Sequence, residues 1–304
     1  MKRILITGSN GLLGQKITNL FLNNKNYQLL NTSIEDKSYL NKVNNLYYKK
    51  LNIVNRSEVL KLVDDFVPDI IINTAAITNV DECETERALA WKVNVKGVEN
   101  IIYAAKMVGA KIIHFSSDYV FDGKSGPYNE KDRPNPLSYY GRTKLASENL
   151  LISSGIVYTI IRTMVLYGIA QNVKDNFAVW LYNNLKQCKQ IRVVDDQIGN
   201  PTLVDDLAFS VLKIVEFDRT GLYHIAGSDL ISRFDFAIAL AKEFKFDKKL
   251  ISPIKTPILK QPAPRPLKSG FITLKAEIEL SLKMSGINQG LMIFHNQILN
   301  SIND

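Results

Sequence analysis

The sequence is poor in cysteine and in long apolar runs. Its 304 residues include two cysteines, Cys83 and Cys188, too few for a disulfide framework and without the spacing of a metal site. A reducing cytoplasm is therefore the expected compartment. No apolar run approaches the ~20 residues of a membrane helix, and residues 1–14 are too short and too interrupted by glycine for a signal peptide. The shortage of cysteines excludes a small secreted domain stabilised by disulfides. Without a long apolar run, no membrane partner is expected.

The charge balance is basic but diffuse. Basic residues exceed acidic residues by 38 to 30, a formal net charge of +8. The lysines are scattered, and no basic block with interleaved aromatic residues marks a nucleic-acid surface, so no nucleic acid partner is expected. The excess of basic residues is compatible with an anionic substrate such as a nucleotide or a phosphate ester. It is equally compatible with a well-solvated surface that has no charged partner. The hydrophobic content of 46% is that of a globular chain with a substantial core.

Short apolar runs alternate with longer helical patterns in the first half of the chain. The strand-like runs are rich in isoleucine and show no in-out alternation, which predicts a parallel sheet buried on both faces. The alternation predicts an α/β fold with a doubly wound, Rossmann-like parallel sheet. The expected strands are 3–8, 27–31, 68–76, 110–117 and 157–163, and the expected helices are 11–24, 56–66, 84–109 and 138–154.

The pattern loosens in the second half. We expect residues 1–165 to form a dinucleotide-binding domain and residues 166–304 to form a smaller α+β substrate-binding lobe, with residues 203–226 returning to the sheet as a helix and a strand. Two further helices are expected at 176–187 and 233–244. Prolines cluster in residues 252–266, which predicts an extended loop.

A glycine loop lies between the first strand and the first helix. Gly8 permits a tight turn, Gly11 lets the backbone approach a pyrophosphate, and Gly14 lets the helix pack closely on the sheet. The free N–H groups and the helix dipole would attract the anion. In this strand–loop–helix context the spacing predicts dinucleotide binding, and the competing interpretation is a glycine turn kept for packing alone.

The end of the second strand bears on the choice of dinucleotide. A carboxylate there would bind the ribose 2′-hydroxyl of NAD. The strand ends instead in Asn31, Thr32 and Ser33, and Glu35 and Asp36 follow slightly late. No arginine is present to hold a 2′-phosphate, although a lysine is near. The sequence therefore leans towards NADPH and leaves NADH as the alternative.

A tyrosine and a lysine on one helical face point to proton transfer. Tyr140 and Lys144 are four residues apart, so an ammonium could stabilise the phenolate and lower its pKa from ~10. Ser117 ends a strand at the carboxyl edge, where it could hold a substrate carbonyl. Ser116 is the alternative donor, but strand alternation turns it the other way. The competing interpretation is a solvated helix face, of which Tyr139 is an example.

The order of the motifs carries a resemblance. The stretches TGSNGLLG, NTAAITNVDECE, VNVKGVENI, FSSDYVFDG, YYGRTK and DDQIGNPT occur in succession, and APRPLKSG follows. Together they resemble the extended short-chain dehydrogenases/reductases. More narrowly, the stretch SSDYVFDGKSGPYNEKDRPNPLSYYGRTKLASE is similar to the dTDP-4-dehydrorhamnose reductase family. The resemblance runs from residue 1 to about residue 275.

The resemblance implies roles for individual residues. It implies a catalytic set of Ser117, Tyr140 and Lys144 and a supporting Asn94. For each implied polar residue the alternative is a structural hydrogen bond, and for Arg265 the alternative is a surface charge. The implied dinucleotide residues are Gly8, Asn10, Gly11, Leu12, Gly14, Ala75, Ala76, Asn94, Arg162 and Thr163, with Tyr140 and Lys144. The implied substrate residues are Asp81, Asp118, Tyr119, Gln197 and Arg265.

The chain departs from the family pattern at two places. Some relatives bind magnesium through glutamates at a dimer interface, one of them just after the glycine loop, but this chain has Gln15 and Lys16 there. The resemblance therefore implies no metal site. In the late arginine–proline segment Lys268 stands where the family carries asparagine, which leaves the sugar and the nucleotide unspecified.

The implied activity is the NADPH-dependent, or NADH-dependent, reduction of a nucleotide-linked 4-keto-6-deoxy sugar in deoxysugar and cell-surface polysaccharide biosynthesis. The partner is the nucleotide sugar, and a homodimer is left open. One alternative is an epimerase or dehydratase on the same fold, although related dehydratases carry Asp-Glu where this chain has Asp118 and Tyr119. The other is a non-catalytic subunit like the methionine adenosyltransferase β subunit, against which the complete Ser/Tyr/Lys set argues.

Overall fold

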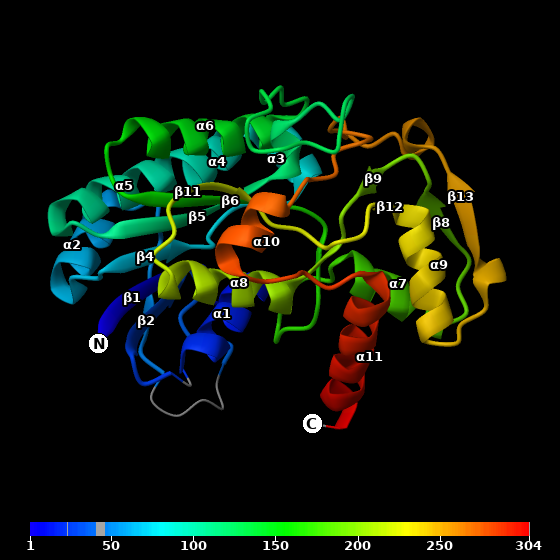
Figure 1. Ribbon diagram of the computed structural model, residues 1–304, viewed down its shortest axis with the longest axis horizontal. Coiled ribbons are helices and arrows are strands. Elements are labelled where there is room, and N and C mark those ends of the chain that lie inside the picture. The colour runs from blue at the N-terminus through cyan, green and yellow to red at the C-terminus, as the bar shows by residue number, and fades with distance from the viewer. Residues whose placement is uncertain (23, 41–45, 304) are drawn as a thin grey trace.

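A seven-stranded sheet forms the centre of the computed structural model, which describes residues 1–22, 24–40 and 46–303 (Figure 1). The strand order is β11-β6-β5-β4-β1-β2-β3, and all neighbours are parallel. The prediction of a doubly wound α/β fold is therefore confirmed. The strands are β1 (Lys2–Thr7), β2 (Tyr27–Ser33), β3 (Tyr48–Lys50), β4 (Ile70–Asn73), β5 (Lys111–Ser117), β6 (Tyr158–Thr163) and β11 (Gly221–His224).

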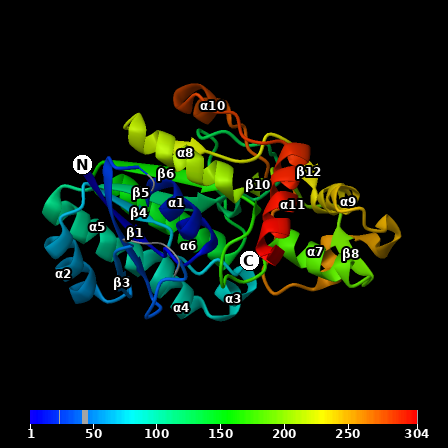
Figure 2. The same cartoon turned by 90° about the horizontal axis from the view of Figure 1, so that it is seen from below.

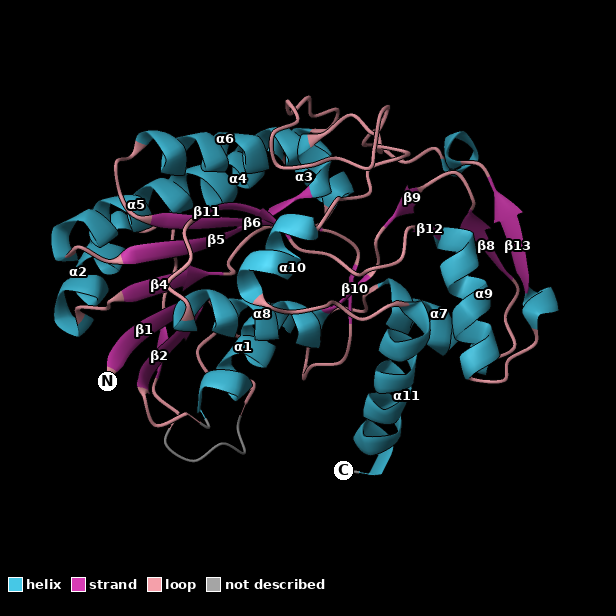
Figure 3. Ribbon diagram, in the orientation of Figure 1, coloured by secondary structure: helices cyan, strands magenta, loops and turns pink. Residues whose placement is uncertain are grey.

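Helices cover both faces of the sheet (Figure 3). Ile4 and Ile6 point to one face and pack with Ile17 of the first helix, whereas Leu5 points to the other face and packs with Val63. This alternation explains why the strands are apolar throughout. One face carries α1 (Leu12–Leu22), α8 (Val204–Glu216) and α10 (Leu274–Leu280), and the other carries α2 (Arg56–Phe66), α5 (Gly97–Val108) and α6 (Tyr139–Ser153).

A smaller group of elements lies beyond the carboxyl ends of the strands (Figures 1 and 2). Its core is aromatic, with Tyr167 edge-on to Phe236 and to Phe294. Its helices are α7 (Phe177–Lys186), α9 (Arg233–Glu243) and α11 (Ile287–Asn303). Its two-stranded ladders are β7 (Leu166–Tyr167) with β10 (Thr202–Leu203), β9 (Ile198–Gly199) with β12 (Ile231–Ser232), and β8 (Ile191–Val194) with β13 (Ile251–Ile254).

The long helix expected at residues 84–109 is interrupted. The segment instead forms α3 (Val80–Thr85), α4 (Arg87–Trp91), a π-helical turn η1 (Lys92–Lys96) and then α5. The side chain of Asn79 caps α3 by accepting from the N–H groups of Asp81 and Glu82. The π turn contains Asn94, and such turns often occur at functional sites.

The proline-rich segment is only partly a loop. Residues 251–254 form β13, parallel to β8, and Thr256–Leu259 form the 3-10 helix η4. Pro253 is tolerated because the ladder has two strands, so one edge of β13 needs no N–H donor. The sequence did not predict β3 or α11. No helix of the described residues is long and apolar enough to cross a membrane.

Candidate active site

The strand order reverses between β1 and β4, which opens a crevice at their carboxyl ends. Gly8 follows β1 with φ +71°, and a Cβ there would lie 2.6 Å from the backbone nitrogen of Ala75. Only glycine fits this approach. The structure therefore brings the glycine loop against Ala75, one of the predicted dinucleotide residues, and Ala76 follows it in the chain.

The other two glycines of the loop differ in their surroundings. A Cβ on Gly14 would lie 2.5 Å from the Gly8 carbonyl oxygen, so Gly14 allows α1 to pack against the loop. A Cβ on the exposed Gly11 would approach only that same oxygen, at 3.2 Å. Among the described residues, the space beside Gly11 is therefore open at the N-terminus of α1, where the dipole favours an anion.

Three buried hydroxyls at this edge lack a hydrogen-bond partner among the described residues. They are Ser9 Oγ in the glycine loop, Ser116 Oγ near the end of β5 and Thr163 Oγ1 at the end of β6. Buried polar atoms are normally satisfied, so unpaired ones at one edge indicate a missing polar ligand. Together with the open space at Gly11, they fit a bound dinucleotide.

Asn10 and Gln15 hold the glycine loop to its neighbours. Asn10 Nδ2 donates to Glu35 Oε2 at 3.1 Å and to the Lys37 carbonyl at 3.0 Å, which fixes the turn after β2. Gln15 Nε2 donates to the carbonyl oxygen of Asn10, and the Gln15 side chain exchanges two hydrogen bonds with the backbone of Gln171. The amide side chains at both positions therefore serve loop geometry.

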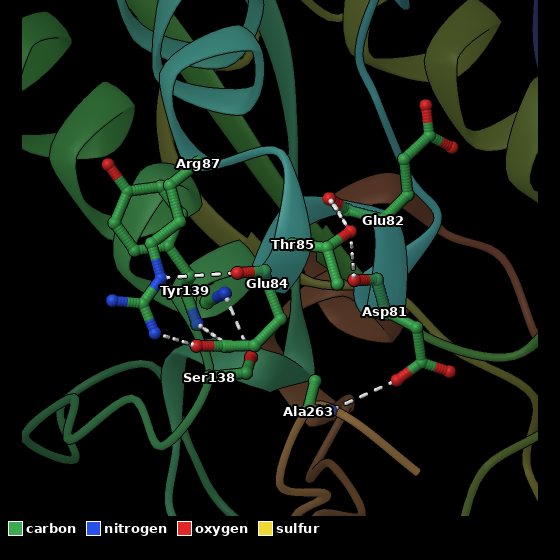
Figure 4. A network of polar contacts seen from close by, with 9 residues as sticks. Asp81, Glu82, Glu84, Thr85, Arg87, Ser138, Tyr139 and Ala263 are labelled. Atoms are coloured by element: carbon green, nitrogen blue, oxygen red, sulfur yellow. Dashed lines mark hydrogen bonds and ion pairs between the residues drawn. The ribbon is translucent and has the colours of Figure 1, made fainter.

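The predicted catalytic side chains converge at the end of β5. Ser138 caps α6, so Tyr140 and Lys144 lie on its first two turns, and both side chains are buried. Ser117 lies close enough to Tyr140 to affect its pKa, and Ser117 Oγ itself donates to Asp118 Oδ1 at 2.9 Å. Tyr139 lies elsewhere: Figure 4 shows it beside Arg87, with its backbone N–H on Glu84. The two tyrosines therefore occupy different environments, as the helical spacing predicted.

The electrostatics of this pair differ from the expectation in one respect. Burial, reinforced by the charge of Asp118, raises the pKa of Tyr140 above its ordinary value, so the expected lowering by Lys144 is absent. Burial also lowers the pKa of Lys144 to about 8. A low-dielectric site disfavours both charges. Near neutral pH the phenol keeps its proton, which is the form that a general acid needs.

Two further predicted dinucleotide residues have structural partners. Asn94 donates to the Thr143 hydroxyl at 3.1 Å and exchanges hydrogen bonds with the backbone of Ile77, so it links the segment after β4 to α6. The Arg162 guanidinium donates twice to buried Glu148, at 2.9 and 2.6 Å. Its side chain therefore lies in a buried ion pair, although its strand does reach this edge.

The predicted substrate residues lie around a narrow crevice beside Tyr140. Asp118, Tyr119 and Gln197 line it, and the rings of Tyr119 and Tyr140 are edge-on at 5.5 Å. Asp81 does not line this crevice. It accepts a hydrogen bond from Arg265 Nη2 at 2.8 Å, and Figure 4 shows its bond to the Ala263 backbone. Arg265 is therefore paired, not a solvated surface charge.

A buried network that the sequence did not predict joins the loops to the catalytic helix. Thr7 Oγ1 donates to Asn73 Oδ1 at 2.7 Å, and Asn73 Nδ2 donates to His114 Nδ1 at 3.1 Å. His114 Nε2 donates to Ser147 Oγ at 3.0 Å, and Ser147 Oγ donates to the Lys144 carbonyl at 2.7 Å. Burial holds the pKa of His114 well below its usual value, so the ring stays neutral.

This network predicts a large effect for His114→Leu. Leucine leaves the amide of Asn73 and the hydroxyl of Ser147 each without a buried partner, at about 1–3 kcal/mol per group. We expect the free energy of unfolding, measured by urea denaturation, to fall by about 2–4 kcal/mol. The control is His295→Leu: His295 is 30% exposed and pairs with Glu243, so its loss should be below about 1 kcal/mol. Equal losses would contradict a special role for His114.

Comparisons of the sequence with known proteins identify a family and several relatives. The family model of the RmlD substrate binding domain matches residues 1–298. A dTDP-4-dehydrorhamnose reductase of Aggregatibacter actinomycetemcomitans is 37% identical over 257 residues, 82% of this chain and 82% of that protein. The methionine adenosyltransferase 2 subunit beta of Xenopus laevis is 31% identical over 259 residues, 83% of this chain and 75% of that protein.

A solved structure agrees over almost the whole chain. It is the crystal structure of a dTDP-4-dehydrorhamnose reductase from Bacillus anthracis in complex with NADP, with a TM-score of 0.86 and 33% identity. The match covers 97% of this chain and 99% of that one. The resemblance predicted from the ordered motifs is therefore confirmed. The chain belongs to the RmlD substrate binding domain family.

Proposed function

We propose that this chain is an NADPH-dependent reductase of a nucleotide-linked 4-keto-6-deoxy sugar. One observation carries the proposal: Tyr140, which keeps its proton and interacts with Ser117, lies beside a narrow crevice at the edge that holds the glycine loop. A reductase with NADP bound has this fold at 33% identity, and a 37% identical relative has the same named activity. The proposed setting is deoxysugar synthesis in the cytoplasm.

The chain's own side chains supply proton transfer and orientation. Bound NADPH would supply the hydride to C4 of the sugar. Ser117 and Tyr140 would hold the ketone oxygen, and Tyr140 would donate its proton as negative charge develops there. Lys144 would hold the nicotinamide ribose and favour the phenolate that remains. Burial of all three side chains keeps water from the reacting atoms.

The dinucleotide specificity rests on the turn after β2. Glu35 accepts hydrogen bonds from Asn10 and Ser33, which lower the pKa of its carboxyl despite partial burial. An ionised Glu35 would accept from the ribose hydroxyls of NADH and would repel the 2′-phosphate of NADPH. The NADP complex of the relative supports NADPH, and NADH remains the second cofactor to test.

The two rival activities differ from this one in specific features. A dehydratase needs a second acid after the hydroxyl residue, but here Tyr119 follows Asp118, and Asp118 accepts from Ser117 and Ser269. A regulatory subunit needs no proton donor, whereas this chain keeps Ser117, Tyr140 and Lys144 together and buried. Net consumption of NADPH with dTDP-, UDP- and GDP-linked 4-keto sugars separates the reductase from both rivals.

The proposed division of labour follows the fold. Residues 1–165, with the returning helix α8 and strand β11 in residues 203–226, would hold the dinucleotide. The rest of residues 166–304 would hold the sugar nucleotide beyond the strand ends. A homodimer would leave both sites complete, since each proposed site residue comes from one chain.

The pKa of Lys144 predicts a pH dependence. Below about pH 8 the free enzyme holds the ammonium and the neutral phenol, and above that pH Lys144 loses its proton while Tyr140 keeps its own. Because kcat/KM reports ionisations of the free enzyme, we expect kcat/KM to fall as the pH rises through about 8. Arginine stays charged, so a Lys144→Arg variant should lose this fall. An unchanged pH profile in that variant would refute the assignment.

A further inference from the structure

One narrow crevice begins where the proton would be delivered. Its lining includes Tyr119, Gln197, Arg233 and Ser269. The Tyr119 ring is edge-on to the ring of Tyr140 and also faces this crevice. A substrate reduced at Tyr140 therefore extends past Tyr119 towards Arg233, a residue that the sequence did not mark as functional.

Two arginines near this crevice have different partners. Arg265 is bound by Asp81 at 2.8 Å and by the Ala263 carbonyl at 3.0 Å, and its side chain is 9% exposed. Arg233 is the first residue of α9 and is half-buried. Its guanidinium makes no hydrogen bond or ion pair with the part of the chain that the structure describes, and it stacks 4.9 Å from the Phe177 ring centre.

Asp118 attracts Arg233, but no hydrogen bond or ion pair joins the two side chains in the described structure. Its Oδ1 accepts from Ser117 at 2.9 Å and its Oδ2 accepts from Ser269 at 2.6 Å. Burial raises the pKa of this carboxyl, and the charge of Arg233 acts in the opposite direction. Both carboxylate oxygens are therefore bonded to serine hydroxyls, and neither is bonded to the Arg233 guanidinium.

A half-buried cation that no protein group bonds pays a desolvation free energy, which a bound anion would offset. Burial lowers the pKa of the Arg233 guanidinium; the charges of Tyr119 and Asp118 oppose this shift, and Arg265 adds to it as a like charge. Stacking on Phe177 compensates little of the cost of burial at a partly exposed site. The guanidinium lines the crevice without a bonded partner in the described structure, so its N–H groups can donate to an anion bound there as a ligand.

We propose that Arg233, together with Arg265, binds the diphosphate of the sugar nucleotide. The inference rests on the proposed function, because a 4-keto sugar carries its diphosphate on C1, across the pyranose ring from C4. With C4 at Tyr140, the diphosphate lies one sugar ring away, on the Arg233 side of Tyr119. A guanidinium binds phosphate oxygens in pairs, and lysine reproduces that geometry poorly.

Calorimetric titration tests the proposal without turnover. The probes are dTDP, UDP and GDP, and the one that binds the unaltered chain most tightly is titrated into Arg233→Gln, Arg233→Lys and a control, Arg192→Ala, which changes an exposed residue of β8. We expect Arg233→Gln to weaken the nucleoside diphosphate at least about tenfold, or ~1.4 kcal/mol. Arg233→Lys should lose less, Arg192→Ala should lose nothing, and NADPH affinity should be unchanged in all three.

The outcomes separate the two proposals. Unchanged diphosphate affinity in a folded Arg233→Gln variant overturns the role of Arg233 and leaves the reductase intact. An equal loss of NADPH affinity also overturns it, because the arginine would then serve the dinucleotide. If Arg233→Gln does not fold, the Arg233→Lys titration decides on the same criterion. Failure of the unaltered chain to bind any nucleoside diphosphate would reject the proposed substrate class itself.

Discussion

Replacing Tyr140 with phenylalanine is expected to lower kcat at least about a hundredfold, the usual contribution of a positioned acid. The change removes only the hydroxyl that interacts with Ser117, and the ring keeps its edge-on contact with Tyr119. NADPH affinity should therefore persist. Steady-state kinetics give kcat, and a fluorescence titration gives the dinucleotide affinity.

The neighbouring tyrosine supplies the matched control. The Tyr139 ring lies beside Arg87, outside the group formed by Ser117, Tyr140 and Lys144 (Figure 4). Tyr139→Phe should leave kcat within about twofold, since phenylalanine retains the ring that faces the guanidinium. Comparable losses from both variants would contradict the assignment of the acid.

Replacing Gly11 with valine is expected to weaken NADPH binding at least about a hundredfold, or ~2.7 kcal/mol. The side chain would occupy the open space beside the N-terminus of α1, where the pyrophosphate should approach the backbone. Because the one close protein atom is the Gly8 carbonyl oxygen at 3.2 Å, folding should survive with a small adjustment. Calorimetry measures the affinity and thermal melting checks the fold.

Substitution of Gly14, in the same loop, is expected to affect folding more than NADPH binding. A Cβ there would lie 2.5 Å from Gly8 O and 2.7 Å from Ser9 Cα, so Gly14→Ala must displace backbone. We expect its main effect to be a lower melting temperature. If Gly11→Val stays folded and leaves the NADPH affinity unchanged, the pyrophosphate is not bound at this loop.

The sheet could be predicted because each strand is marked by a short apolar run in its own stretch of sequence. Runs such as Ile70–Asn73 are apolar on both faces, which only a buried parallel strand satisfies. Both bounds of the helix Arg56–Phe66 were predicted to the residue, and the structure shows that Asn55 caps its start and that Pro68 lies two residues beyond its end. The break in the long helix was not predicted, because the π turn around Asn94 depends on its bonds to Ile77 and Thr143.

The partners of charged residues could not be predicted, because they are distant in sequence. Asp81 and Arg265 lie 184 residues apart and bind each other. The sequence predicted the strand that contains Arg162, but the orientation of the Arg162 side chain is set by its bonds to the buried side chain of Glu148. His114 did leave a signal, since a polar residue inside an isoleucine-rich strand must find a buried partner. No such signal marked Arg233, because its crevice is lined by residues far apart in the sequence, such as Tyr119 and Ser269.

Isotope transfer tests the central claim most directly. NADPH deuterated at the transferable position is incubated with the dTDP-, UDP- and GDP-linked 4-keto-6-deoxy sugars, and the products are examined by NMR. The account predicts deuterium bound to C4 of the sugar, one dinucleotide consumed per sugar reduced, and about a hundredfold slower labelling with Tyr140→Phe. Sugar turnover without consumption of NADPH, or labelling that Tyr140→Phe leaves unchanged, would contradict it.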